Sequence, residues 1–336
     1  MAHHKVTLIP GDGIGPEVAD AAARAIDATG VKIDWERVEL NADIIQKRGE
    51  VLPPEVLDSL NRTYTGLKGP VTTPIAGGFQ SVNVALRKRL DLFANVRPIR
   101  SLPGVKTRFQ DLKLDMVIFR ENTEDLYSGL EHEVVKDVVT SLKVITRTAS
   151  IRIANYAFDY AKATNRRKVS AVHKANIMKL ADGLFLRCCR EVAAGHPEVR
   201  YEELIVDNAS MQLVIRPETF DILLLPNLYG DIISDLCAGL VGGLGIVPGA
   251  NMGEKHAVFE AVHGSAPDIA GKGIANPTAL MLSGVMMLIH LKEMDAANRL
   301  QAAIESVYAS QTAVTRDLGG NATTQQFTDA VVAAMK

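Results

Sequence analysis

Residues 220–240 read FDILLLPNLYGDIISDLCAGL, a short apolar run followed by residues with helical spacing. The run at 220–225 predicts a buried strand, and residues 230–240 predict the helix that follows it. Apolar runs and helical patterns alternate in this way along the chain, which is typical of βαβ units and a largely parallel sheet. The sequence therefore predicts an α/β fold. The other strands are expected at 5–9, 114–119, 142–147, 168–173, 202–206 and 256–259, and the other helices at 16–28, 53–61, 82–90, 150–164, 175–194, 277–291, 295–310 and 323–335.

The length of the chain, 336 residues, favours two domains. The stretch GGLGIVPGANMG at 242–253 is rich in glycine and proline, which is typical of a hinge or a boundary. We expect a large open sheet with flanking helices in a domain built from both chain ends, residues 1–98 and 250–336. A smaller α/β domain, residues 99–249, is expected to be inserted between them, which predicts a cleft between the two.

Composition excludes several classes of protein. The net charge is −2, so no overall positive field attracts nucleic acid or a membrane surface. No segment reaches the roughly 18 uninterrupted apolar residues of a membrane span. The three cysteines, Cys188, Cys189 and Cys237, show neither a disulfide framework nor a metal-ligand spacing, so we expect reduced thiols. Residues 1–5 run straight into a strand and leave no room for a leader peptide, which favours a cytosolic protein.

Charged residues follow four of the apolar runs. Arg120 follows MVIF, His173 and Lys174 follow VSAV, Asp207 follows LIV, and Asp231 follows ILLLPNLYG. In open α/β sheets the carboxyl ends of the strands line the ligand crevice, so four charged groups at such ends favour a site. Any one of them alone is better explained as a solvated turn, because most charged residues are exposed.

Asp231 and Asp235 lie four residues apart on a predicted helix, so both carboxylates project from one face. A bound cation would reverse their mutual repulsion, and hard divalent ions such as Mg²⁺ or Mn²⁺ choose carboxylate oxygen. Asp207 is a candidate third ligand. The alternative, from the spacing alone, is a pair of surface charges on a helix.

The segment GGFQSVNVALR at 77–87 is a second candidate site. A glycine-rich turn that leads into a helix leaves backbone N–H groups free for an anion. Ser81 lies at the helix entrance, and Asn83 and Arg87 share one face of the helix. The alternative assigns Ser81 to capping and Arg87 to the solvated surface. Three guanidiniums would suit a substrate with two or three carboxylates, and the candidates are Arg87, Arg97 and Arg120.

Two further patterns are interpreted without a ligand. The run GDGIG at 11–15 follows a strand and opens a helix, but it is not the six-residue dinucleotide fingerprint, so we do not expect a coenzyme there. The basic residues at 166–168 are interpreted as a solvated turn rather than a nucleic-acid patch.

Six longer segments resemble the β-decarboxylating dehydrogenase family, which includes isocitrate, homoisocitrate, 3-isopropylmalate and tartrate dehydrogenases. They are IPGDGIGPE (9–17), SVNVALRKRLDLFANVRP (81–98), FRENTEDLYSG (119–129), VHKANIMK (172–179), NLYGDIISD (227–235) and EAVHGSAPDIAGKGIANP (260–277). The resemblance spans nearly the whole chain and implies a two-domain α/β fold unlike the Rossmann fold. It also implies a homodimer with active sites shared between subunits, in which residues of about 130–150 interlock.

The resemblance assigns roles to single residues. It implies substrate-binding residues at Ser81, Asn83, Arg87, Arg97 and Arg120. It implies an acid/base pair at Tyr127 and Lys174, and metal ligands at Asp231, Asp235 and Asp207, with Lys174 and Asp207 reaching in from the partner subunit. It implies coenzyme contacts at Thr73, His263, Gly264, Ser265, Ala266, Pro267, Asp268, Ile269 and Asn276.

The resemblance further implies oxidative decarboxylation of isocitrate with NAD and with Mg²⁺ or Mn²⁺. Members that use isocitrate carry a Ser-x-Asn pattern, as at Ser81 and Asn83, and these side chains can hydrogen-bond a γ-carboxylate that an apolar side chain would exclude. The Asp268 carboxylate can accept from ribose hydroxyls and would repel a 2′-phosphate. Three alternatives stay open: another substrate of the family, a non-catalytic regulatory subunit, and a metal-dependent hydrolase or lyase without redox chemistry.

Overall fold

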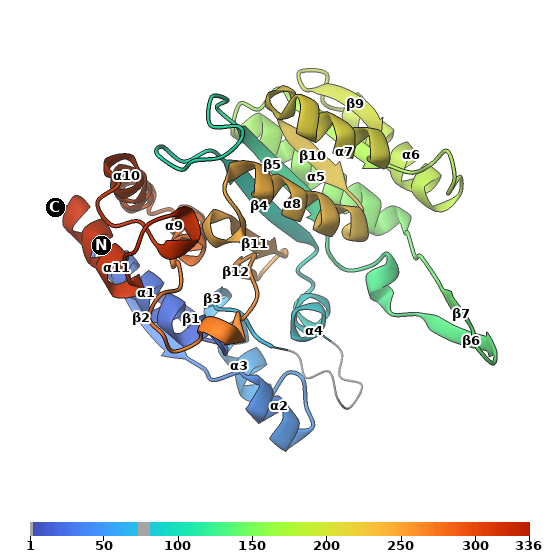
Figure 1. Cartoon of the computed structure of the whole chain (residues 1–336). Coiled ribbons are helices and arrows are strands. Elements are labelled where there is room, and N and C mark those ends of the chain that lie inside the picture. The colour runs from blue at the N-terminus through green and yellow to red at the C-terminus, as the bar shows by residue number, and fades with distance from the viewer. Residues whose placement is uncertain (1–2, 73–80) are drawn as a thin grey trace.

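The computed structural model describes residues 3–72 and 81–336. Its strands are β1 (His3–Ile9), β2 (Lys32–Arg37), β3 (Thr65–Lys68), β4 (Ala94–Arg100), β5 (Asp115–Glu121), β6 (Glu131–Val135), β7 (Val138–Ser141), β8 (Lys168–His173), β9 (Arg200–Ile205), β10 (Ile222–Leu225), β11 (Pro248–Met252) and β12 (Ala257–Ala261). Ten of these form one sheet in the order β2-β1-β3-β12-β11-β4-β5-β10-β8-β9, which crosses the molecule in Figure 1. The strands β6 and β7 form a separate two-stranded sheet.

The large sheet is parallel at both flanks and antiparallel in its middle. The strands β2, β1, β3 and β12 pair in parallel, and so do β5, β10, β8 and β9. Between these flanks, β12 pairs antiparallel with β11, β11 with β4, and β4 with β5. The predicted α/β class and the largely parallel sheet are therefore confirmed.

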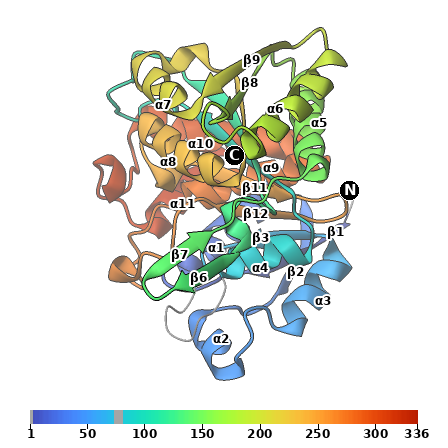
Figure 2. The same ribbon diagram turned by 90° about the vertical axis from the view of Figure 1, so that its right-hand side faces the viewer.

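Helices cover both faces of this sheet. They are α1 (Gly15–Asp27), α2 (Ala42–Arg48), α3 (Pro54–Thr63), α4 (Val82–Arg89), α5 (Arg147–Ala163), α6 (Ala181–Ala194), α7 (Val206–Ile215), α8 (Asn227–Val241), α9 (Thr278–His290), α10 (Met294–Ser310) and α11 (Thr324–Ala334). Figure 2 shows α5 and α6 on one side of the sheet and α7 and α8 on the other. The helices α1, α9, α10 and α11 pack against one another. No helix in the described residues is long and apolar enough to span a membrane.

Continuous apolar runs become strands that are buried on both faces. Every residue of β10 has lost its contact with solvent. Parallel strands covered by helices on both sides bury both sets of side chains, so their sequence is apolar throughout and does not alternate. Capping side chains fix the starts of helices: Thr146 accepts from the N–H of Ala149 at α5, and Thr323 and Gln326 form a capping box at α11.

Two sequence-based expectations are wrong in detail. Residues 142–147 are not a strand, because Thr146 caps α5 and only an isolated bridge at Val144 lies in this stretch. Residues 175–180 form turns and not helix, so α6 begins only at Ala181. In both stretches, the hydrogen bonds of a cap or a turn replace the regular ladder, and apolar spacing does not reveal such local bonds.

The stretch at 242–253 is not a linker. It contains β11, which pairs with β12 and β4 in the middle of the sheet. Pro248 and Gly249 hide this strand from a pattern-based prediction, because both residue types are typical of turns. Arg97 and Pro98 hide β4 in a similar way, because they interrupt its apolar run. The other elements that were not predicted are β2, β3, β6, β7, α2 and α7.

The division into two domains stays our proposal. The strands β2, β1, β3 and β12 come from the two chain ends, whereas β5, β10, β8 and β9 come from the middle of the chain. The strands β4 and β11 lie between these groups, and the boundaries proposed after residues 98 and 249 fall inside them. We therefore expect these two strands to carry any movement of one half against the other.

Packing explains the glycine-rich loop at 11–15. Gly11 has a φ of +80°, and a Cβ at this position would lie 1.9 Å from the carbonyl oxygen of Pro70. The N–H of Ile14 donates to the carbonyl oxygen of Ser265 at 2.8 Å. The loop therefore supports the segment around Ser265, and its glycines have a structural reason that needs no dinucleotide.

Gly11→Ala should destabilise the protein by roughly 2 kcal/mol or more, because alanine would have to adopt a left-handed conformation and would also clash with the Pro70 carbonyl. Gly30→Ala is the matched control: Gly30 has a φ of +86° but nothing lies within 4 Å of its added Cβ. The control should cost only about 1 kcal/mol. Urea denaturation measures both losses, and equal losses would contradict the packing role of Gly11.

Candidate active site

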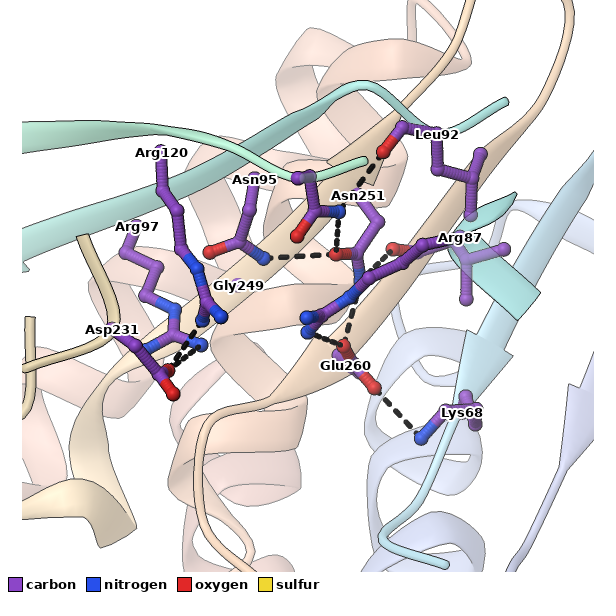
Figure 3. A network of polar contacts seen from close by, with 12 residues as sticks. Lys68, Arg87, Leu92, Asn95, Arg97, Arg120, Asp231, Gly249, Asn251 and Glu260 are labelled. Carbon is purple, nitrogen blue, oxygen red and sulfur yellow. Dashed lines mark hydrogen bonds and ion pairs between the residues drawn. The ribbon is translucent and has the colours of Figure 1, made fainter. Parts of the chain in front are cut away.

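Three buried arginines form the centre of the candidate site. Arg97 lies on β4, Arg120 near the end of β5, and Arg87 in the last turn of α4. Their side chains are almost completely removed from solvent. Figure 3 shows Arg97 and Arg120 converging on Asp231, while Arg87 points toward Glu260. The fold thus brings the three predicted arginines together, and the alternative of a solvated Arg87 is wrong.

Asp231, on α8, joins two of these arginines to a tyrosine. Its Oδ1 accepts a hydrogen bond from Nη1 of Arg120 and lies 3.6 Å from Nη2 of Arg97. Its Oδ2 accepts a hydrogen bond from the hydroxyl of Tyr127. Burial alone would raise the pKa of Asp231, but Arg120, the Tyr127 hydroxyl and Arg97 together lower this pKa. The carboxylate is therefore ionised and orders the cations around it.

Close contact between α8 and β5 sets this geometry. Gly230 precedes Asp231, and a Cβ on Gly230 would lie 2.5 Å from Cγ of Arg120. Only glycine lets the helix approach the Arg120 side chain so closely. The Nε of Arg120 also donates to Oδ1 of Asn227 at 2.9 Å, one turn earlier on α8. The protein thus fixes this guanidinium without help from a ligand.

Tyr127 lies on a short 3₁₀ turn, Leu126–Ser128, that follows β5. The guanidinium carbon of Arg120 lies 5.0 Å from the centre of its ring. Burial, and then the hydrogen bond to Asp231, raise the pKa of the Tyr127 phenol. The phenol therefore keeps its proton at neutral pH, as a proton donor in catalysis must.

An ion pair that the sequence patterns did not reveal lies beside Arg87. The Nζ of Lys68 is 2.7 Å from Oε2 of Glu260, and both side chains are buried. The Nη2 of Arg87 is 3.5 Å from Oε1 of Glu260, and Asn251 donates to the same oxygen at 2.7 Å. Burial alone would raise the pKa of Glu260, but Lys68 and Arg87 hold it at about 2. The signal that could have found this pair is a charged residue inside each of two buried strands, TGLK and AVFEA.

A cavity of about 120 Å³ opens between the arginines and the predicted coenzyme segment. Asn83, Arg87 and Arg97 line one part of it, and His263 and Gly264 line another. Buried polar groups are normally paired, so unpaired ones indicate a polar ligand, and guanidinium N–H groups suit carboxylates. Six buried atoms at or beside this cavity have no hydrogen-bond partner in the described residues: Asn83 Oδ1, Arg87 Nε, Asn95 Oδ1, Arg97 Nε, Arg120 Nη2 and His263 Nε2.

Helix α4 brings two of the predicted substrate-binding residues, Asn83 and Arg87, to the cavity, whereas Ser81 is exposed and is not part of its lining. Ser81 occupies the N-cap position, but its side chain makes no capping hydrogen bond. Capping therefore does not explain this serine. Asn83 and Arg87, one turn apart, both line the cavity, whereas Lys88 and Arg89 are exposed as expected.

Two of the three predicted metal ligands lie together. Asp231 and Asp235 share a face of α8, and the guanidinium of Arg97 lies 3.6 and 3.4 Å from their oxygens. Asp207 lies elsewhere, in the first turn of α7, where it accepts a hydrogen bond from Nζ of Lys174 at 2.6 Å. Within residues 3–72 and 81–336, no three His, Cys, Asp or Glu side chains are grouped to hold a metal ion. Among the described residues, Asp207 is therefore not grouped with the Asp231–Asp235 pair.

A partly buried lysine, Lys143, connects the loops that carry Lys174 and Tyr127. The backbone N–H of Lys174 donates to Oδ2 of Asp182 at 2.6 Å, and Oδ1 of Asp182 lies 2.6 Å from Nζ of Lys143. The same Nζ lies 3.7 Å from Oδ1 of Asp125, two residues before Tyr127. Both carboxylates are buried, so loss of Lys143 would leave two buried charges unpaired. Sequence patterns gave no sign of this residue.

The predicted coenzyme segment forms an exposed turn after β12. Pro267–Ile269 form a 3₁₀ turn, preceded by Ala266 with a left-handed φ of +41°. Asp268 is exposed, and its backbone oxygen accepts from Nζ of Lys272 at 2.7 Å. In the described part of the chain, nothing donates to the Asp268 carboxylate, so it is free to accept from a ligand.

Asn276 has structural partners. It donates to Oδ2 of Asp317 at 2.9 Å and to the hydroxyl of Tyr308 at 3.2 Å. Its Oδ1 accepts from the backbone N–H of Thr278 at 3.0 Å, at the start of α9. These bonds already use most of the capacity of the amide. Thr73, also predicted to contact the coenzyme, lies outside the described residues.

Comparison with known proteins places the chain in a family. A model of the isocitrate/isopropylmalate dehydrogenase family matches residues 5–331. The chain belongs to this family. The match covers the arginines, the acidic residues of α8 and the segment after β12.

Individual relatives are similar along nearly the whole chain. Catalytic subunit 5 of the mitochondrial NAD isocitrate dehydrogenase of Arabidopsis thaliana is 57% identical over 97% of this chain and 87% of that protein. The chloroplastic 3-isopropylmalate dehydrogenase of Solanum tuberosum is also 57% identical, over 89% of this chain and 84% of that protein. The crystal structure of isocitrate dehydrogenase from Methylococcus capsulatus has a TM-score of 0.95 at 49% identity and covers 99% of both chains.

These relatives contradict the expectation of a cytosolic protein. The isocitrate dehydrogenase subunits among them are named as mitochondrial proteins. Targeting peptides are removed from mature proteins, so the residues around β1 do not report the compartment. The cytosolic assignment was therefore wrong.

Glu260→Gln should destabilise the protein at neutral pH by roughly 3–5 kcal/mol, because it leaves the buried ammonium of Lys68 without its counter-charge. The pKa of Glu260 is lowered from 4.5 to about 2 in the folded protein, so its stabilisation is complete above pH 4.5 and is lost as pH falls toward 2. The gap in unfolding free energy between the two proteins should therefore shrink below pH 4.5.

Urea denaturation from about pH 7 down to about pH 3 measures this gap. Glu254→Gln, at an exposed position, is the matched control and should change stability by less than about 0.5 kcal/mol. A gap for Glu260→Gln that stays constant over the whole pH range would show that the ion pair does not hold the carboxylate as described.

Proposed function

We propose that the chain catalyses the NAD-dependent oxidative decarboxylation of isocitrate to 2-oxoglutarate and CO₂. The observation that carries this proposal is the cluster of three buried guanidiniums with unpartnered N–H groups, beside a cavity that Asn83 also lines. Isocitrate bears three carboxylates, and each guanidinium can bind a carboxylate through paired hydrogen bonds. Membership of the family and the names of the closely similar subunits support the same reaction.

The start of α4 supports isocitrate over the other substrates of the family. An isocitrate and a 3-isopropylmalate dehydrogenase share the same 57% identity with this chain over their aligned residues, so the names of relatives do not decide the substrate by themselves. Within the described residues, the buried Oδ1 of Asn83 has no hydrogen-bond partner, and the Ser81 hydroxyl is not used for capping. Both groups can donate to a carboxylate once the amide turns its N–H₂ inward, whereas an isopropyl group would leave them unpaired.

Mg²⁺ or Mn²⁺ fits the carboxylates of Asp231 and Asp235, which are hard oxygen donors on one helix face. We propose that Asp207 of the partner subunit completes this set, because Asp207 lies apart from the pair within one chain. A cation bound there would polarise the substrate hydroxyl and the carbonyl that replaces it, which favours both proton loss and decarboxylation.

Lys174 and Tyr127 are assigned the proton transfers. Lys174 of the partner subunit, held by Asp207 and Asp182 of its own chain, would take the proton from the substrate hydroxyl. Tyr127 retains its proton because its pKa is raised, and it would deliver this proton to the carbon that has lost CO₂. Arg120 lies against the ring of Tyr127 and would hold the substrate carboxylate in reach of the phenol.

NAD fits the segment after β12. The Nε2 of His263 is buried and has no partner in the described residues, which indicates a polar ligand beside it. The free carboxylate of Asp268 can accept from ribose hydroxyls and would repel the 2′-phosphate of NADP. The nicotinamide would accept the hydride from the carbon that bears the substrate hydroxyl.

A homodimer is supported by the arm formed by β6 and β7, residues 131–141. This arm projects from the body of the molecule in Figure 1, and every residue of its two strands is exposed. Val134 and Val139 are more than half exposed, at 62% and 64%. An isolated hairpin with apolar side chains in water is marginal and requires a covering surface. A second copy of the chain would cover the arm and bring its own Lys174 and Asp207 to the site.

The wild-type chain should form NADH from isocitrate, and a chelator of divalent cations should abolish the reaction.

Tyr127→Phe should lower turnover by about 10²–10⁴, because it removes the proton donor. Calorimetry should still detect binding of isocitrate with Mg²⁺, because the guanidiniums are untouched. Turnover that survives Tyr127→Phe would remove this residue from the chemistry, and a wild-type chain that uses only 3-isopropylmalate, homoisocitrate or tartrate would overturn the substrate.

Asn83→Leu should raise the KM for isocitrate by at least about tenfold, because an apolar side chain would face the γ-carboxylate. Binding of NAD, followed by fluorescence, should stay unchanged. The matched control is Arg89→Leu, which removes an exposed polar residue from the same helix and should leave both quantities as they are. Isocitrate kinetics that survive Asn83→Leu would show that α4 does not select the substrate.

A further inference from the structure

A second and larger cavity lies on the face of the sheet opposite the arginines. We name it the rear cavity, and its volume is about 410 Å³, within the range of small-molecule pockets. The strand β4 contributes to both faces: Val96, Pro98 and Arg100 line the rear cavity, whereas Asn95 and Arg97 line the cavity of the active site. Successive side chains of a strand point to opposite faces, so the two cavities lie back to back.

The rear cavity joins both halves of the molecule. Val117 on β5 and the helix α5 contribute from the middle of the chain, and Phe259 on β12, with Leu282 and Val285 on α9, contribute from its C-terminal part. In Figure 2, α5 lies on the side of the sheet away from α8, which carries Asp231. Most of these walls are apolar, and a large apolar hollow that water can enter marks an interaction site. The proposed reaction makes no use of it.

Two phenols supply hydrogen-bond donors to this cavity. Tyr156 and Tyr160, one turn apart on α5, both line it, and the ring of Phe119 packs against both. Burial raises the pKa of each phenol, so both keep their protons. Both tyrosines are half-buried. Within the described residues neither hydroxyl donates to a protein acceptor, so both are available to an acceptor on a ligand.

Cations outnumber carboxylates in the lining. Arg100, Arg166 and Lys292 contribute positive charges, and Asp115 contributes the one carboxylate. Asp115 lies 2.5 Å from Nη2 of Arg166 and 3.5 Å from Nη2 of Arg100, so its charge is already balanced. Arg166 also pairs with Asp221 at 2.9 Å, outside the lining. Lys292 is exposed at the edge of the cavity and has no ion pair in the described residues, so its positive charge is available to a ligand.

We propose that the rear cavity binds a small organic anion with one carboxylate and an apolar body, such as a medium-chain fatty acid. The apolar walls would take the body, and the positive charge of Lys292 and the phenols would take the carboxylate. A molecule with several carboxylates, such as isocitrate, does not fit, because it would bury charges that the lining does not balance. The residues of this site are not those assigned to the proposed catalytic reaction.

Fluorescence of anilinonaphthalene sulfonate, an apolar anion, can report on this site in the purified full-length chain. We expect saturable binding of one probe per chain, displacement by decanoate, and no displacement by isocitrate with Mg²⁺. Val285→Trp should weaken binding by at least about tenfold, because an indole would fill the space. Lys292→Glu should weaken it by roughly three- to tenfold.

Lys47→Glu is the matched control, because Lys47 is an exposed lysine on α2, outside the lining. It should leave probe binding unchanged, and all variants should keep wild-type thermal unfolding. If Val285→Trp fails to fold, the affinity of Lys292→Glu for the probe still tests the proposal. Absence of saturable binding, full displacement by isocitrate, or equal effects of Lys292→Glu and Lys47→Glu would overturn the proposal. None of these readouts depends on turnover, so they stand apart from the test of catalysis.

Discussion

The structure depends on holding three like charges together inside the protein. Burial, and then the neighbouring guanidiniums, lower the pKa values of Arg97 and Arg120. Three carboxylates offset this cost: Asp231 faces both of these arginines, Asp235 lies 3.4 Å from Arg97, and Glu260 faces Arg87. Lys68 also pairs with Glu260, so four cations face three carboxylates among the described residues. The site is therefore preorganised for an anionic ligand. Helix α8 and strands β4 and β5 are positioned by the same contacts.

Much of this site could be predicted from sequence, because its residues stand where general rules put them. Arg120 and Lys174 follow buried runs, and Asp231 and Asp235 have the spacing of one helix face. Two other residues of the site could not be predicted, because each is a charged residue within an otherwise uncharged strand. Lys68 and Glu260 are charges within short buried strands, and each is tolerated only because the other lies across the fold. The sequence around Lys68 contains no pattern that identifies Glu260 as its partner, and the reverse is also true.

The relation between Lys174 and Tyr127 shows a different limit. Sequence can nominate both as acid/base residues, but it does not say whether they meet in one chain. In the structure each has its own carboxylate, Asp207 for Lys174 and Asp231 for Tyr127. Lys143 then connects their two loops through buried ion pairs. In a dimer that shares its sites, this lysine would tie the acid of one site to the base of the other within a single subunit.

The alternation of β4 also bears on how the sheet assembles. Arg97 faces the acidic residues of α8, while Val96 and Pro98 face the rear cavity. A slip of this strand by one residue against β5 or β11 would exchange the two faces. The guanidinium would then sit among aliphatic side chains with no counter-ion, a state far above the native one in free energy. The position of Arg97 thus disfavours a pairing of the central strands that is shifted by one residue. A chain with such a pairing would lower its free energy by separating the strands and pairing them in the native register.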